Sequence, residues 1–289
     1  MMIRLGFGMV LALAGPLAMA QPVLHAVGLE SQYADVLAQI GGPYVKVTSV
    51  QSNPNTDPHE FEVTPGVAVA LHGADLVVEN GLGYDAWADQ MLDGTRAKLL
   101  SAQKLLNLPD DSPNPHLWYR TDTMPEVAAA AAAFFAAKDP AHKAAYMANL
   151  KAFDASLAPW KQEMAELKAK YASAPVAVTE PVADYLLQAA GMKIMTPFSF
   201  ELAVMNGTDP SPQDVAAEET LLRDRKVRIF AYNVQVTDPE TQALLALAKQ
   251  NDVQVLPVYE LMPAGATHYQ DWMLQTTNAL GRALAASAK

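Results

Sequence analysis

The sequence predicts an α/β protein with two lobes, each with a mainly parallel sheet flanked by helices, joined by one long backbone helix. Two series of short β-branched runs alternate with helical patterns, and a single long amphipathic pattern separates them. Strands that alternate with helices of this length are typical of parallel βαβ units. We therefore expect an N-terminal α/β lobe at 21–139, a connecting helix at 140–171 and a C-terminal α/β lobe at 172–289.

The first twenty residues are predicted to be a secretory signal peptide, 1–20. They read MMIRLGFGMVLALAGPLAMA, with one early positive charge, a short apolar run and a small-x-small ending. The apolar run is shorter than the roughly 20 residues that a membrane span requires. Because the chain contains no cysteine, we expect neither a disulfide nor a lipid attached through one. These features predict a periplasmic protein with no membrane anchor, stabilised by its core.

The charge balance excludes one class of partner. The chain carries a formal net charge of −11 and is 51% hydrophobic. An acidic protein repels polyanions, so we expect no nucleic-acid partner, and the same field mildly attracts cations.

The elements of the first lobe follow one another in a regular order. We expect strands at 23–28, 44–50, 76–79 and 97–102, and helices at 30–40, 65–72, 84–92 and 126–138. In the second lobe we expect strands at 176–179, near 194, 227–232 and 253–258, and helices at 182–190, 212–223, 240–249 and from 269 onward.

The connecting helix is predicted from a stripe of eight large apolar residues spaced alternately by four and three. They are Tyr146, Leu150, Phe153, Leu157, Trp160, Met164, Leu167 and Tyr171. A helix over 140–171 would be about 48 Å long, which is enough to pack against both lobes and limit their relative movement. Pro159 should kink it. The alternative is a coiled-coil dimer. The stripe is short, however, and no clear pattern of charged residues occupies the e and g positions beside it, so we expect a monomer.

Two histidines occur in similar, stiff surroundings. His59 lies in DPHEF and His116 in NPHLW, so each follows a proline and precedes an aromatic residue by two positions. Proline restricts its own backbone and that of its predecessor, and a side chain presented with little freedom loses less entropy on binding. A simple surface turn is the alternative interpretation of either loop.

Two glutamates complete a candidate metal site. Glu180 and Glu260 each come just after a predicted strand of the second lobe, as His59 and His116 do in the first. Ligands of open α/β sheets bind beyond the carboxyl ends of strands. If the two sheets face each other, two imidazoles and two carboxylates converge, a set that suits zinc, manganese or ferrous iron. Alternatively, Glu180 could simply favour the start of a helix. Glu201 and Asp209, expected to flank a loop, are reserve carboxylates.

The sequence resembles the metal-binding solute-binding proteins of zinc, manganese and iron ABC importers. The resemblance spans the mature chain and is carried by NPNTDPHEFEVTP, ADLVVENGLGYDAW, NPHLW, KDPAHKAAYMANLKAF, TEPVADYLLQAAGM, DPSPQDV and the acid after VQVLPV. It implies two α/β lobes joined by one long helix, with a divalent ion buried between them. It also implies a membrane permease and its ATPase as partners.

The resemblance assigns each of the four candidate ligands a position in the family pattern. His59 and His116 match its two N-lobe histidines, and Glu180 matches a position that is histidine in many zinc-type members and glutamate in many manganese-type members. Glu260 matches a position that is usually aspartate, so a nearby acid could be the fourth ligand in its place. The histidine-rich loop of many zinc scavengers is missing. Because two glutamates offer four oxygens, manganese or iron is favoured over zinc as the single divalent cargo.

The predicted function is capture of a divalent transition metal in the periplasm and delivery to an ABC importer. The alternatives are a zinc-specific protein of the same class, a secreted metal-buffering or adhesion protein, and a secreted metallohydrolase. Four protein ligands leave no open position for an activated water, and no HExxH or GxSxG motif occurs. We therefore expect a binding protein and not an enzyme.

Overall fold

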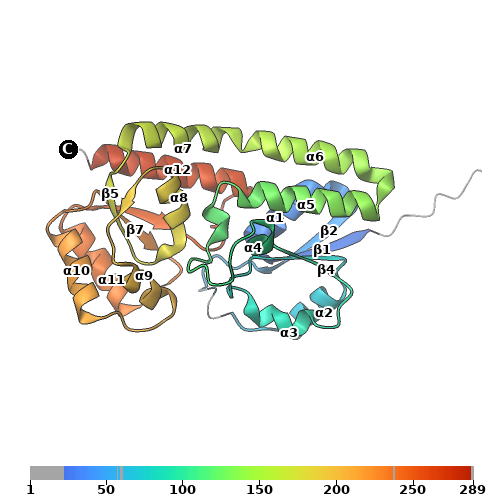
Figure 1. Ribbon diagram of the computed structural model, residues 1–289, viewed down its shortest axis with the longest axis horizontal. Helices are drawn as coiled ribbons and strands as arrows, with labels where there is room; N and C mark the ends of the chain where they lie inside the picture. The colour runs from blue at the N-terminus through green and yellow to red at the C-terminus, as the bar shows by residue number, and fades with distance from the viewer. Residues whose placement is uncertain (1–22, 57, 59–60, 237, 288–289) are drawn as a thin grey trace, which may run out of the picture.

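The computed structural model confirms the two-lobe α/β class and describes residues 23–56, 58, 61–236 and 238–287 (Figure 1). The predicted signal peptide and His59 lie outside these residues. Within the described ranges, no helix has both the length and the apolar character needed to cross a membrane.

Each lobe is built on a four-stranded parallel sheet. The N-terminal sheet contains β1 (Leu24–Glu30), β2 (Val45–Gln51), β3 (Leu76–Glu79) and β4 (Lys98–Ser101) in the order β2-β1-β3-β4. The C-terminal sheet contains β5 (Pro175–Val178), β6 (Lys193–Ile194), β7 (Ile229–Asn233) and β8 (Gln254–Val258) in the order β6-β5-β7-β8. Both sheets therefore share one topology, and in each the strand order reverses between the first and third strands, where such sheets bind ligands.

Helices cover both faces of each sheet. They are α1 (Ser31–Gly41), α2 (Pro65–His72), α3 (Asp89–Leu92), α4 (Ala102–Leu105), α5 (Thr123–Lys138), α6 (Lys143–Ser156), α7 (Ala158–Tyr171), α8 (Asp184–Ala189), α9 (Phe198–Met205), α10 (Pro212–Arg223), α11 (Pro239–Gln250) and α12 (Tyr269–Ala286). In Figure 1, α5, α6, α7 and α12 run along one side of the molecule, above both sheets.

The strands alternate between a shared core and a separate core in each lobe. In β5, Val176 and Val178 belong to the cluster that also includes buried residues of α1, α5, α6, α7 and α12. Ala177, between them, faces a second cluster with Phe200 of α9 and Leu222 of α10. Successive strand residues point to opposite faces, so burial on both sides explains why β5, with the sequence PVAV, is apolar throughout. The shared cluster holds the two lobes together.

The predicted connecting helix is interrupted. It begins as a 3-10 turn at Pro140–His142, continues as α6, breaks at Leu157 and resumes as α7. Pro159 is the second residue of α7. Proline has no N–H to donate into the preceding turn, so the helix is interrupted at Leu157, two residues before the position at which the kink is predicted. α6 packs against α1 and α5, whereas α7 packs against α12. The division into domains at 139/140 and 171/172 stays a prediction.

Two local expectations are wrong. The segment 84–92, expected to be one helix, forms a turn, a 3-10 turn at Ala86–Ala88 and the single turn α3. Glu201 does not flank a loop but lies in the first turn of α9. The run FSFELAVM shows no one-sided stripe, because apolar residues also occur outside its buried face, as at Phe198, which is 42% exposed, and periodicity therefore did not reveal it.

Candidate metal centre

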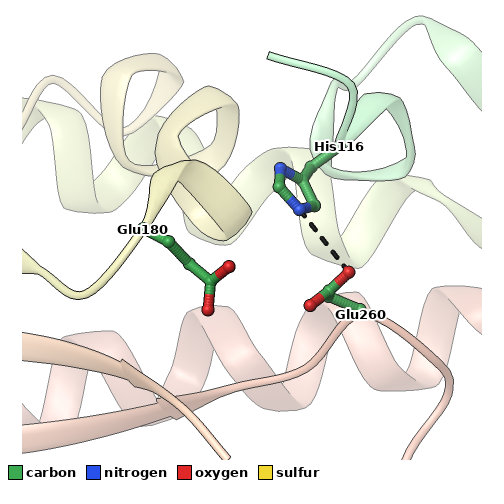
Figure 2. Close-up of side chains that lie close together, drawn as sticks. All are labelled: His116, Glu180 and Glu260. Carbon is green, nitrogen blue, oxygen red and sulfur yellow. Dashed lines mark ion pairs between the residues drawn. The ribbon is translucent and has the colours of Figure 1, made fainter. Parts of the chain in front are cut away.

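Three of the four predicted ligands meet between the lobes (Figure 2). His116, Glu180 and Glu260 are all buried, with exposed fractions of 0, 2 and 0%. Each offers a ligand-type atom, and these atoms all lie within 4.8 Å of one another. Two ligand atoms on one zinc ion are roughly 3.4 Å apart when each bond is about 2.1 Å long. The separation of 3.6 Å between His116 Nε2 and Glu260 Oε2 is close to that value.

His116 is held by its neighbour Asn114. The Asn114 side-chain oxygen accepts the His116 backbone N–H and contacts His116 Nδ1, both at 2.9 Å. The Asn114 amide nitrogen donates to the Pro181 carbonyl at 2.7 Å, which fixes the amide orientation and links the lobes. An amide oxygen only accepts, so Nδ1 carries the proton of the neutral ring and Nε2 keeps the lone pair that a metal requires.

The loop behind His116 is supported by a second asparagine. Asn80 follows β3, donates to the Pro115 carbonyl at 2.8 Å and accepts from the Tyr33 hydroxyl at 2.6 Å. Its backbone N–H donates to the Asp85 carboxylate. Burial, and then repulsion from Glu79, raises the pKa of Asp85 to about 7.

Glu180 and Glu260 follow two strands of the C-terminal sheet, β5 and β8, which lie on either side of β7. Glu180 lies two residues beyond β5 in extended backbone, directly before the 3-10 turn Pro181–Ala183, and its side chain does not cap that turn. Glu260 lies two residues beyond β8, and its backbone N–H donates to the Gln235 side-chain oxygen at 2.5 Å. The position of both acids follows from the strand ends, as the sequence predicts.

One amide joins the two carboxylates. The Asn233 side-chain nitrogen donates to Glu180 Oε1 at 2.8 Å and to Glu260 Oε1 at 2.7 Å. The Tyr84 hydroxyl, from the N-terminal lobe, donates to Glu260 Oε2 at 2.8 Å. The two acids are therefore oriented from both lobes.

Sequence reasoning missed these orienting residues. Asn233 is the last residue of β7, so the strand-end rule that selected the acids also applied to it. Tyr84 carried no such signal, because it lies in the turn that was expected to be a helix.

The reserve acid Glu201 belongs to a different cluster. Within the described part of the chain, Glu201, Asp184 and Glu218 form a buried group under α8, α9 and α10. Burial raises the pKa of Asp184 to about 7 and that of Glu218 to about 8. Burial, and then Asp184, raises the pKa of Glu201 to about 10. Asp209 is exposed in the loop before α10. Neither reserve acid joins the group of His116, Glu180 and Glu260.

Other contacts close the two lobes on each other near the site. The Gln32 side chain donates to the Glu260 carbonyl at 3.1 Å, and the Gln235 amide nitrogen donates to the Pro54 carbonyl at 2.9 Å. On α1, Asp35 accepts from the Tyr269 backbone N–H at 2.8 Å and pairs with His268 at 2.9 Å. The candidate centre therefore lies in a closed interface.

Comparison with known proteins identifies the family of this chain. The model of the family described as zinc-uptake complex component A, periplasmic (ZnuA) matches residues 30–283. The manganese-binding lipoprotein MntA of Bacillus subtilis is 23% identical over 244 residues, which cover 80% of this chain and 78% of that protein. The metal ABC transporter substrate-binding lipoprotein ScbA of Streptococcus cristatus is 27% identical over 158 residues, 50% of this chain and 51% of that one.

Solved structures share the fold. The periplasmic zinc-binding protein TroA of Treponema pallidum has a TM-score of 0.75 at 16% identity, over 92% of this chain and 99% of that chain. A manganese-bound periplasmic metal-binding protein of Candidatus Liberibacter asiaticus has a TM-score of 0.72 at 18% identity, over 90% and 99%. With a family match over most of its length, the chain belongs to the ZnuA family of periplasmic metal-binding proteins, the solute-binding components of ABC metal importers.

Proposed function

We propose that this protein captures one divalent transition-metal ion between its lobes, in the periplasm, and delivers it to the permease of an ABC importer. The proposed ligands are His116, Glu180 and Glu260, with His59 as the fourth. The observation that carries the proposal is the approach of three buried ligand-type side chains, from both lobes, to within 4.8 Å.

A bound cation would offset a cost that is built into the fold. Two carboxylates lie buried side by side, and desolvation of a charged group is expensive unless an opposite charge compensates it. The amide of Asn233 and the hydroxyl of Tyr84 supply partial charges. A divalent ion matches the formal charge of −2 on the two acids and uses the lone pair that Asn114 leaves on His116 Nε2.

The site suits binding better than catalysis. The family consists of solute-binding proteins and not enzymes. A catalytic metal keeps a position for water or substrate, whereas four side chains in a closed interface would fill the shell of a four-coordinate ion. Chemistry on a substrate would also need an acid or base beside the ion that is not itself a ligand.

The family match and the relatives support a transition metal as cargo. One relative is named for manganese and one structural neighbour for zinc. Two glutamates favour a hard ion such as manganese or iron by their charge and oxygens, and zinc is the alternative.

The first test is metal binding by the purified mature protein. Calorimetry with Zn²⁺ and with Mn²⁺ should give one site per chain for the wild type. His116→Ala should lower the affinity at least about tenfold, because it removes a ligand. His72→Ala is the matched control, since His72 is exposed at the end of α2 and contacts only the Ala68 carbonyl of its own helix among the described bonds. A wild type that binds neither ion, or equal affinities for wild type and His116→Ala, would refute the proposed site.

The second test concerns delivery. The metal-loaded protein should stimulate ATP hydrolysis by its permease and ATPase in proteoliposomes, and the metal-free protein should not. Stimulation that does not depend on metal would argue against a role in import. Genes for a permease and an ATPase beside this one would support import over simple metal buffering.

A further inference from the structure

Asn233 occupies a position from which it reaches both acids of the proposed site. It ends β7, beside β5, where the strand order of the C-terminal sheet reverses, and it is 0% exposed. Its backbone N–H donates to the Thr179 hydroxyl at 3.1 Å. The backbone of Asn233 is therefore anchored at the end of the strand.

The amide of Asn233 has one possible orientation. Its side-chain oxygen accepts the Gln235 backbone N–H at 3.0 Å, so its nitrogen, with two hydrogens, faces the carboxylates. Those hydrogens serve Glu180 Oε1 at 2.8 Å and Glu260 Oε1 at 2.7 Å. Both donors of the amide are thus used on the two acids.

This bridge separates the two Oε1 atoms. The hydrogens of an amide diverge by about 120°, so acceptors on near-linear bonds of these lengths lie about 4.8 Å apart. Oxygens bound to one ion at about 2.2 Å can be no more than about 4.4 Å apart, even on opposite sides of it. While Asn233 bridges the acids through two near-linear bonds, one ion cannot bind both Oε1 atoms.

We propose that Asn233 determines the metal preference of the site by limiting how many carboxylate oxygens reach the ion. The inference rests on the proposed function. Of the four carboxylate oxygens, at most three can then bind the ion. Zinc accepts four or five ligand atoms, whereas manganese favours six. Asn233 therefore shifts the site toward zinc, against the preference for manganese or iron that the charge of the shell indicates.

The experiment measures coordination number and selectivity together. Asn233→Ala removes both donors, and Asn233→Ser leaves a single hydroxyl donor that can hold only one acid. Asn251→Ala is the control. Asn251 lies in the same lobe and donates to the Leu247 carbonyl. It precedes β8, whereas Glu260 follows β8, so the two residues lie at opposite ends of that strand. Each protein is titrated with Zn²⁺, Mn²⁺ and Co²⁺, whose d–d absorption is strong at low coordination number and weak at six.

In the wild type we expect strong Co²⁺ bands, which should weaken in Asn233→Ala. The ratio of zinc affinity to manganese affinity should fall at least about tenfold in that variant, the scale of changes to residues that orient ligands. Asn233→Ser should change both quantities in the same direction by less, and it carries the test if Asn233→Ala does not fold. Asn251→Ala should match the wild type.

Several outcomes would overturn the inference. A wild type with weak, six-coordinate Co²⁺ bands would contradict it directly. Equal losses of zinc and manganese affinity with an unchanged Co²⁺ spectrum would make Asn233 merely structural. A wild type that binds none of the three ions would instead refute the proposed function, and the inference with it.

Discussion

Glu218→Gln should stabilise the protein by an amount that grows with pH. Glu218 lies on the buried face of α10 and is 0% exposed, and burial raises its pKa from 4.5 to about 8. Between these values the folded chain holds a proton that the unfolded chain has lost, so the glutamate costs stability as the pH rises. Glutamine has the shape of the neutral acid and cannot ionise, so the substitution removes that cost.

The magnitude follows from the difference between the two pKa values. At pH 7 the glutamate of the unfolded chain is ionised, because the pH is 2.5 units above its pKa of 4.5, whereas Glu218 of the folded chain is still mostly protonated. This difference lowers the free energy of unfolding by about 3 kcal/mol. At pH 5 the same linkage is worth less than about 1 kcal/mol. Effects that do not depend on pH, such as a changed hydrogen bond to the amide, cancel when the two pH values are compared.

Urea unfolding of wild type and Glu218→Gln at pH 5 and pH 7 measures this difference. The advantage of the variant should be larger at pH 7 by about 2 to 3 kcal/mol. Glu219→Gln is the control, because Glu219 is the next residue on α10 but pairs with Arg223 at the surface, with 41% of its side chain exposed. A variant whose advantage is the same at both pH values, or shrinks as the pH rises, would refute the assignment of a neutral buried acid.

Three further predictions concern packing, the lobe interface and the cargo. Gly28→Ala should lower the free energy of unfolding by more than about 2 kcal/mol in urea, because the added Cβ would overlap the Ala34 backbone nitrogen. Gly66→Ala is the control, because the nearest atom to its added Cβ is 3.7 Å away, and equal effects of the two substitutions would contradict the predicted overlap. Asp35→Asn should cost about 1 to 2 kcal/mol through the weakened bonds to His268 and Tyr269, and an unchanged urea midpoint would show that this interface adds nothing. Zn²⁺ at 100 times its dissociation constant should raise the unfolding free energy of the wild type by about 2.7 kcal/mol, and no shift would argue that the ion does not bind the folded state.

The fold was predictable from the sequence because both lobes repeat simple patterns. The strands are short β-branched runs, and helices such as α2 (Pro65–His72) and α10 (Pro212–Arg223) end where the sequence indicates. α9 was missed because apolar residues such as Phe198 also occur outside its buried face, which removes the stripe that identifies a surface helix. The segment 84–92 was misassigned because its backbone turns to bring Tyr84 toward Glu260, a tertiary contact that local propensity does not encode.

The candidate site was predictable only in its ligand-type residues. Strand ends selected Glu180 and Glu260, and the Pro-His pattern selected His116. The bonds that orient them come from Asn233, Asn114 and other residues distant in sequence, whose partners depend on how the strands and lobes are arranged. Hydrogen-bond partners of this kind follow from three-dimensional distances, which no spacing rule supplies.

The break at Leu157 has a consequence for how the cargo could leave. α6 packs on one half of the molecule and α7 on the other, so bending at Leu157 would turn one half against the other. Along the 14 residues of α7, a lever about 21 Å long, a turn of only about 5° moves the far end by roughly 2 Å. Metal–ligand bonds tolerate deviations of only about 0.2 Å. A tilt too slight to alter the outline of the molecule would therefore disturb the geometry of the proposed metal site.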